Sequence, residues 1–306
     1  MSKRCDQGGD VVGSTKTEPQ PTANTQTGAD TPSSLRVLSL GAGVQSTTLA
    51  LMAAHGEIEP CDCAIFADTQ AEPAYVYKHL EWLKGQLPFP VHVVSTGSLE
   101  ASSLQPRKSR KTGNSYLKTA IPVHVLLPHG GQGTLGRSCT GDYKITPIIR
   151  KTRELIGGES AIRAARKCGA LPLVEQWIGI STDEASRMKP SQNDWIRLRW
   201  PLIERGLSRG ECLRWLEKRN FPQPGKSSCV FCPYHGDRTW RELKLQHPHE
   251  FERAVAFERQ FQKRSAEHAV LRGIPYLHSN CRPLDEINFT DQLDLFENEC
   301  EGMCGV

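Results

Sequence analysis

The chain has 306 residues, of which 38% are hydrophobic and 24% are charged, as in ordinary soluble globular proteins. It contains no apolar run of about 18 residues and no apolar segment after its N-terminus, so we expect neither a membrane span nor a secretory signal. The net charge is +4, and the eleven cysteines favour metal or redox chemistry in the cytoplasm over a disulfide framework.

The first part of the chain is predicted to form a polar tail followed by an alternating α/β domain. Residues 1–34 have hardly any apolar side chain and are expected to be disordered. Strands are predicted at residues 35–40, 63–67 and 91–95, and helices at residues 46–56 and 71–87. Strands that alternate with helices at this spacing indicate a parallel twisted sheet, flanked by helices.

A long polar insertion at residues 96–138 interrupts this alternation and indicates a functional lid or a partly disordered loop. A helix is predicted at residues 144–155 and a strand at residues 175–181. Farther on, Ser208 and Glu211 form the pattern of a capping box at the start of a helix. The expected domains are a disordered tail (1–34), a nucleotide-binding α/β domain (35–205) and a mainly helical C-terminal lobe with a metal site and a cysteine tail (206–306).

A glycine-rich turn joins the first predicted strand to the first helix. It reads Ser-Leu-Gly-Ala-Gly-Val-Gln-Ser over residues 39–46. Small residues let backbone N–H groups approach an anion, and the start of a helix adds a favourable dipole. Open α/β sheets bind ligands at the carboxyl ends of their strands, so this turn is the expected phosphate site. A tight turn without a ligand would give the same glycine pattern.

The turn resembles the PP-loop of phosphoadenosine-phosphosulfate reductases and related ATP pyrophosphatases, which reads Ser-x-Ser-Gly-Gly-x-Asp-Ser. Gln45 stands where that family has an aspartate, which weakens the case for a tightly held Mg²⁺, because this cation prefers anionic oxygen ligands. The resemblance implies a HUP-like fold. It also implies nucleotide-binding roles for Ser39, Gly41, Gly43, Gln45 and Ser46.

Two further segments match the same family in order along the chain. Asp68 and Thr69 follow the second strand, where an Asp can accept hydrogen bonds from a nucleotide or simply cap the next helix. Their segment is similar to the Asp-Thr-Gly stretch of the reductases, which implies that both contact the nucleotide. Residues 177–187 resemble a later reductase motif, which implies nucleotide contacts from Gly179 and Arg187.

Cys139 lies among cationic residues, and this setting predicts a lowered pKa and a thiolate. The related reductases carry a cysteine before a Lys-x-x-Pro helix, and here Lys144 and Pro147 match that pattern. The resemblance implies that Lys144 contacts the nucleotide and that Cys139 is a metal ligand.

Four more residues suggest metal and sulfur chemistry. Cys229 and Cys232 form a Cys-x-x-Cys turn, which suits a metal ion or cluster, or alternatively a redox pair. The C-terminal tail carries Cys300 and Cys304 and is similar to the reductase tail whose cysteine attacks the sulfonyl sulfur; a frayed end is the alternative. The resemblance implies a 4Fe-4S cluster, or zinc, on Cys139, Cys229, Cys232 and Cys300, with Cys304 as the catalytic thiol and His235 as another possible ligand.

Basic residues are concentrated in one part of the sequence. Ten Lys or Arg lie between Arg107 and Arg153, against a single acid, Asp142. Such a patch suits a polyphosphate or nucleic-acid partner, although solvated surface charge is the alternative.

The expected function is adenine-nucleotide-dependent sulfur chemistry like that of phosphoadenosine-phosphosulfate reductases, in which a thiol attacks a bound phosphosulfate. The alternative is an ATP-pyrophosphatase-type enzyme that uses ATP with Mg²⁺ to adenylate and thiolate DNA or tRNA bound by residues 107–118. A second alternative is a metal-stabilised nucleotide sensor without turnover. A sulfur or electron donor protein is a possible partner of either enzyme.

Overall fold

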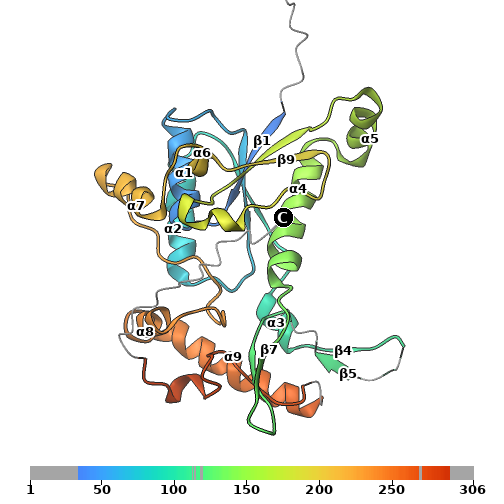
Figure 1. Cartoon of the computed structure of the whole chain (residues 1–306), viewed down its shortest axis with the longest axis vertical. Helices are drawn as coiled ribbons and strands as arrows, with labels where there is room; N and C mark the ends of the chain where they lie inside the picture. Colours follow the sequence, from blue (N-terminus) through green and yellow to red (C-terminus); the bar gives the residue numbers. More distant parts are fainter. Residues whose placement is uncertain (1–33, 112, 114, 118–119, 269–270, 290–306) are drawn as a thin grey trace, which may run out of the picture. The chain divides into compact units, whose positions relative to one another are not determined.

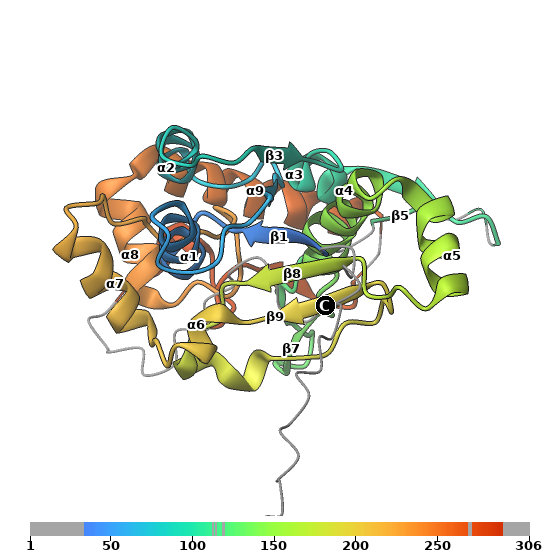
Figure 2. The ribbon, with the colours of Figure 1, turned by 90° about the horizontal axis from the view of Figure 1, so that it is seen from above.

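A five-stranded parallel sheet stands at the centre of the fold (Figures 1 and 2). The computed structural model describes residues 34–289 except residues 112, 114, 118, 119, 269 and 270. The strand order is β3-β2-β1-β8-β9, and every neighbouring pair is parallel, which confirms the predicted sheet. The strands are β1 (Leu35–Leu40), β2 (Cys63–Ala67), β3 (Val91–Val94), β8 (Val174–Ile178) and β9 (Ile196–Arg199). The order reverses at β1, and such a switch point is where open α/β sheets bind ligands.

Alternate side chains of the buried strands face two different layers of helices. Leu38 packs in a cluster with Leu49 of α1, whereas its neighbour Val37 packs with Ile148 of α4 and Ile162 of α5. Successive strand residues point to opposite faces, so an almost continuous apolar strand supplies both cores. The helices of these layers are α1 (Val44–Ala54), α2 (Ala74–Lys84), α6 (Pro201–Glu204) and α7 (Arg209–Lys218) on one face, and α4 (Thr146–Leu155) and α5 (Gly158–Cys168) on the other.

A third apolar cluster lies beyond the carboxyl edge of the sheet. It joins α8 and α9 to a small antiparallel sheet with the order β10-β6-β7. Glu258 of α9 accepts backbone hydrogen bonds from Leu277 and Leu284, both at 2.8 Å, and so fixes the chain that follows β10. The elements are α3 (Leu99–Leu104), β6 (His124–Leu126), β7 (Gln132–Thr134), α8 (Asp237–Gln246), α9 (Pro248–Glu267) and β10 (Ile274–Tyr276). Shorter elements are the hairpin β4 (Pro106–Lys108) and β5 (Ser115–Leu117), the π-helix η1 (Gly141–Ile145) and the 3-10 helices η2 (Thr182–Arg187) and η3 (Leu284–Glu286).

Some helix boundaries differ from those expected. The first helix begins at Val44 with Gly43 as its N-cap, two residues before the predicted start at Ser46. The Ser46 hydroxyl instead accepts a hydrogen bond from the Gly41 N–H at 3.2 Å, because the loop turns back over the helix start. The capping box of Ser208 and Glu211 is confirmed.

The insertion at residues 96–138 holds α3 and four short strands that sequence analysis did not predict. β6 pairs with β10, about 150 residues later in the chain, so His124 lies opposite Tyr276. Three-residue strands whose partners are this distant leave no local periodicity to detect.

All described residues belong to one compact unit. The predicted division near residue 205 stays a prediction, and the expected disorder of the N-terminal tail falls outside the described residues. Within the described part of the chain, no helix is both long and apolar enough to cross a membrane.

Candidate functional site

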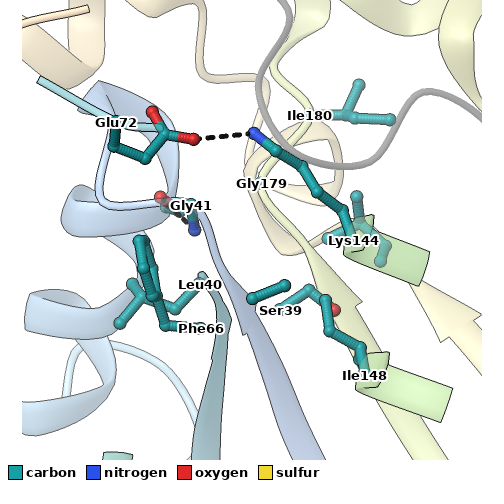
Figure 3. A pocket seen from close by; sticks show the side chains of 12 residues that line it. Ser39, Leu40, Gly41, Phe66, Glu72, Lys144, Ile148, Gly179 and Ile180 are labelled. Atoms are coloured by element: carbon teal, nitrogen blue, oxygen red, sulfur yellow. Dashed lines mark hydrogen bonds and ion pairs between the residues drawn. The ribbon is translucent and has the colours of Figure 1, made fainter. Parts of the chain in front are cut away.

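A pocket opens where β1, β2 and β8 end (Figure 3). It holds about 490 Å³ of space, open solvent at its mouth included. Its apolar walls come from Phe66, Ile148 and Ile180, and polar groups come from the strand ends and loops around them. Of the predicted nucleotide-binding residues, Ser39, Gly41, Ser46, Lys144 and Gly179 line this pocket.

The glycine-rich loop presents the start of α1 to the pocket. Ala42 adopts a left-handed conformation with φ of 58°, and Gly43 follows as the N-cap with φ of −94°. No side chain caps α1, and its first turn carries no acidic residue. The N–H groups at this helix start therefore have the arrangement that favours an anion.

Gly179 lets the end of β8 approach the start of α1. A Cβ atom at this position would lie 3.0 Å from the backbone nitrogen of Ser46 and 3.1 Å from its Cα. Both are backbone atoms, which cannot move aside as the end of a flexible side chain can. Gly179 thus fixes the spacing between β8 and the glycine-rich loop.

Lys144 and Glu72 form an ion pair across the pocket, with 3.2 Å between Nζ and Oε1 (Figure 3). The Glu72 side chain is only 1% exposed and that of Lys144 is 10% exposed. The second carboxylate oxygen of Glu72 is buried and has no hydrogen-bond partner among the described residues. No sequence motif assigned a role to Glu72, although an acidic residue just after a buried strand was a usable signal.

Gln45 and Arg187 both contact Glu184, and neither lines the first pocket. The buried Gln45 amide donates to Glu184 Oε2 at 3.2 Å and lies 3.4 Å from Ser181 Oγ. Arg187 forms an ion pair with the same Glu184. This network ties α1 to η2, so Gln45 fills a structural position.

At the end of β2, Asp68 and Thr69 contact different parts of the protein. Asp68 Oδ1 accepts hydrogen bonds from the Tyr77 hydroxyl and the Gln70 N–H, both at 2.7 Å. It does not cap the next helix, because the N-cap of α2 is Pro73 and no side chain caps that helix start. Thr69 is buried, and its hydroxyl oxygen lies 3.3 Å from the sulfur of Cys229. Neither residue lines the first pocket.

A second pocket adjoins the first and is lined by Cys139, Cys229 and Cys232. Its other walls are mainly apolar, with Leu99 among them. Lys144 lines both pockets, so a single cation lies between the glycine-rich loop and the three thiols.

The segment that carries Cys229 and Cys232 is hydrogen-bonded to the loops that follow β1 and β2. The Val230 N–H donates to the Ala71 carbonyl at 2.8 Å, and the Ser227 hydroxyl donates to the Gly41 carbonyl. The Tyr75 hydroxyl donates to the carbonyl of Lys226 at 3.2 Å. These contacts bring a segment from far along the chain to the loops after β1 and β2.

The prediction of a lowered pKa for Cys139 is wrong. Burial raises the pKa of this thiol by more than Arg137 and Lys144 lower it. Burial likewise raises the pKa of Cys232 to about 11, and burial together with the Glu72 carboxylate raises the pKa of Cys229. The neighbouring cations do lower the pKa of Cys139, but the loss of hydration on burial raises it by more.

The donor atoms in this second pocket fit a thiolate-bound metal group only in part. Three thiols line one cavity, yet no three His, Cys, Asp or Glu side chains within the described ranges adopt a metal-binding arrangement. His235 lies 3.0 Å from the Cys229 carbonyl through Nε2, while its Nδ1 is buried without a hydrogen-bond partner in the described part of the chain. Cys300 and Cys304 lie outside the described residues.

Comparison with known proteins found a similarity among solved structures but none among family models or curated proteins. No protein-family model matches the chain, and no curated protein matches it. Its structure is similar to the crystal structure of a phosphoadenylyl-sulfate reductase from Candida auris in a phosphate complex, with a TM-score of 0.35 and 13% sequence identity. The match covers 64% of this chain and 78% of the other.

Proposed function

We propose that this chain is an enzyme that binds an adenine nucleotide at the carboxyl edge of its sheet and carries out sulfur chemistry in the adjoining pocket. The observation that supports the proposal most is the position of Lys144, which lines both pockets. A phosphoryl or sulfuryl group bound at the glycine-rich loop would then lie near the same cation, Lys144, as the three thiols.

The nucleotide would be held by groups of three kinds. Backbone N–H groups at the start of α1, together with the Ser46 hydroxyl, would bind phosphate oxygens. The Lys144 ammonium would weaken its ion pair with Glu72 and stabilise negative charge on the same phosphates. Phe66, Ile148 and Ile180 offer apolar surface for the adenine ring.

The reaction that we favour is reductive cleavage of a phosphosulfate nucleotide. A thiolate attacks the sulfur, a bond forms between the two sulfur atoms, and the bond from sulfur to the bridging phosphate oxygen breaks. The electron pair leaves with the nucleotide phosphate, where Lys144 stabilises the added charge. Cys304 is the attacking thiol that the sequence predicts. A second thiolate, from a donor protein, then attacks the Cys304 sulfur. A disulfide forms, the bond to the sulfonate sulfur breaks, and sulfite leaves with the electron pair.

A cysteine-bound metal group belongs to the same proposal. Cys139, Cys229 and Cys232 would hold it, with Cys300 completing a 4Fe-4S site or with His235 in the place of Cys300 for zinc. When bound, such a group supplies positive charge that stabilises thiolates which burial otherwise disfavours. Metal analysis of anaerobically purified protein tests this part, and Cys212→Ser, which changes a buried cysteine of another cluster, is its control.

The second candidate is an ATP-dependent enzyme that adenylates and thiolates a nucleic acid. The hairpin β4–β5 favours it, because four exposed basic residues lie there. Gln45 disfavours it, because this residue is an amide and the glycine-rich loop therefore offers no carboxylate to a magnesium ion.

Calorimetry and product analysis with each nucleotide test these alternatives. Release of sulfite from a phosphosulfate nucleotide supports the reductase, and release of pyrophosphate from ATP supports the second candidate. Binding without turnover of either nucleotide would indicate a sensor. If neither nucleotide binds, the proposal is wrong.

A further inference from the structure

The hairpin of β4 and β5, here called the basic hairpin, carries a concentrated positive charge over the twelve sequence positions 106–117. Arg107, Lys108, Arg110 and Lys111 are all exposed, and the twelve residues include no acidic side chain. Figures 1 and 2 show that the hairpin extends outward past α4. Its four cations equal the net charge of the whole chain, which is +4.

The strand register places a cation beside an aromatic ring. Arg107 lies directly opposite Tyr116, so both side chains are on the same face of the two-stranded ribbon. Tyr116 is 39% exposed, so part of its ring surface is open to a ligand. An exposed aromatic ring next to an arginine is the arrangement on which unpaired bases stack.

The opposite face anchors the hairpin. Pro106 pairs with Leu117, which is 3% exposed and belongs to the third apolar cluster. In the described part of the chain, Lys108, Arg110 and Lys111 form no ion pair with an acidic side chain. The hairpin is therefore built into the fold at its base and positively charged at its outer end.

Both ends of the hairpin lead to the cysteine-lined pocket. Leu99, at the start of α3, lines this pocket, and α3 leads directly into β4. After β5 the chain returns at Ile121, which also lines the pocket. The Cys139 N–H donates to the carbonyl of Ala120 at 2.9 Å, so the returning segment supports the first cysteine.

We propose that the basic hairpin binds a single-stranded nucleic acid. The four cations contact phosphates, Tyr116 stacks on a base, and the strand is held beside the cysteine-lined pocket as the acceptor for sulfur. The role as acceptor rests on the second candidate function, in which a nucleic acid is thiolated, whereas binding of the strand does not.

Fluorescence anisotropy with labelled single-stranded DNA and RNA, and with a duplex of equal length, tests the proposal on the full chain. Changing Arg107, Lys108, Arg110 and Lys111 together to Gln should reduce the slope of log affinity against log salt by about 3, since each phosphate contact contributes about 0.7. The matched control changes four exposed cations elsewhere, Arg163, Lys167, Arg214 and Lys218, and should leave both affinity and slope nearly unchanged.

The Tyr116→Ala variant separates stacking from charge. It should weaken binding of single strands roughly tenfold or more without changing the salt slope. The proposal is overturned if wild-type protein binds no strand at low salt, or if the control set reduces binding as much as the hairpin set does. Tighter binding of the duplex, with no effect of Tyr116→Ala, would also overturn it. Nucleotide calorimetry on the hairpin variant reports separately on the proposed function, which predicts unchanged nucleotide affinity.

Discussion

At the scale of single residues, two positions define the candidate site. Lys144 supplies the cation that both pockets share, and Gly179 sets the distance between β8 and the glycine-rich loop. Lys144 was expected at the site through a family motif, but its ion pair with Glu72 was not. Each position yields a prediction that separates binding from folding.

Replacing Lys144 with Met leaves the buried Glu72 carboxylate without its cation, which should lower the free energy of unfolding by about 3 kcal/mol. The double variant Lys144→Met with Glu72→Gln should regain most of that stability, because no unpaired charge stays buried. It should not regain nucleotide affinity. Urea denaturation and calorimetry measure the two quantities, and a double variant that binds like wild type would show that Lys144 does not contact the nucleotide.

The Gly179→Ala variant should weaken nucleotide binding about tenfold, because the added Cβ meets the backbone at Ser46 and displaces the start of α1. Gly133→Ala is the matched control, since a Cβ atom there has nothing within 4 Å. Equal nucleotide affinities in the two variants, measured by calorimetry, would contradict the close approach.

At the scale of elements, a buried polar contact joins α1 to α2. Thr47 Oγ1 of α1 lies 3.0 Å from His79 Nε2 of α2, and both side chains are buried. Burial lowers the pKa of His79 from its ordinary value of 6.5 to about 4, so the folded protein keeps this imidazole neutral.

This pKa predicts a specific loss of stability in acid. Between pH 6.5 and about 4 the unfolded chain binds a proton at His79 that the folded chain does not, so the free energy of unfolding falls as the pH falls. From about pH 7.5 to about pH 5 the contribution of His79 should be a loss of about 2 kcal/mol. Urea denaturation at both pH values measures it, and His79→Gln should remove this part of the pH dependence. An unchanged pH dependence in that variant would contradict the prediction.

At the scale of the whole molecule, the apolar clusters are joined rather than separate. Cys212 and Leu216 of α7 pack in the same cluster as Leu38 of β1. Tyr75 packs against both this cluster and the third one, which contains Phe231 and the C-terminal helices.

Such shared packing predicts one cooperative unfolding transition for residues 34–289. Differential scanning calorimetry of the full chain should give a single peak whose calorimetric and van't Hoff enthalpies agree. A chain that ends at residue 205 should lose this transition, because Leu38 and its neighbours would be exposed to water. Two separated peaks would instead favour independent domains on either side of residue 205.

The sequence by itself determined the elements whose signals are local. The strands at residues 35–40 and 63–67, the parallel arrangement and the capping box at Ser208 follow from apolar runs and from residue types at fixed spacing. The polar residues at the strand ends and the three cysteines could be named for the same reason, although their roles came from family resemblance.

Only the tertiary structure decided which of those residues meet. Gln45 and Asp68 look alike in sequence as polar residues at a candidate site, but one ties α1 to η2 and the other accepts the Tyr77 hydroxyl. Glu72 became part of the pocket through an ion pair with a residue 72 positions later in the chain. The raised pKa of Cys139 arises from burial by distant segments, which outweighs the cations that its own sequence provides. Burial and long-range pairing depend on the packing of the whole chain, and for that reason no local pattern could predict them.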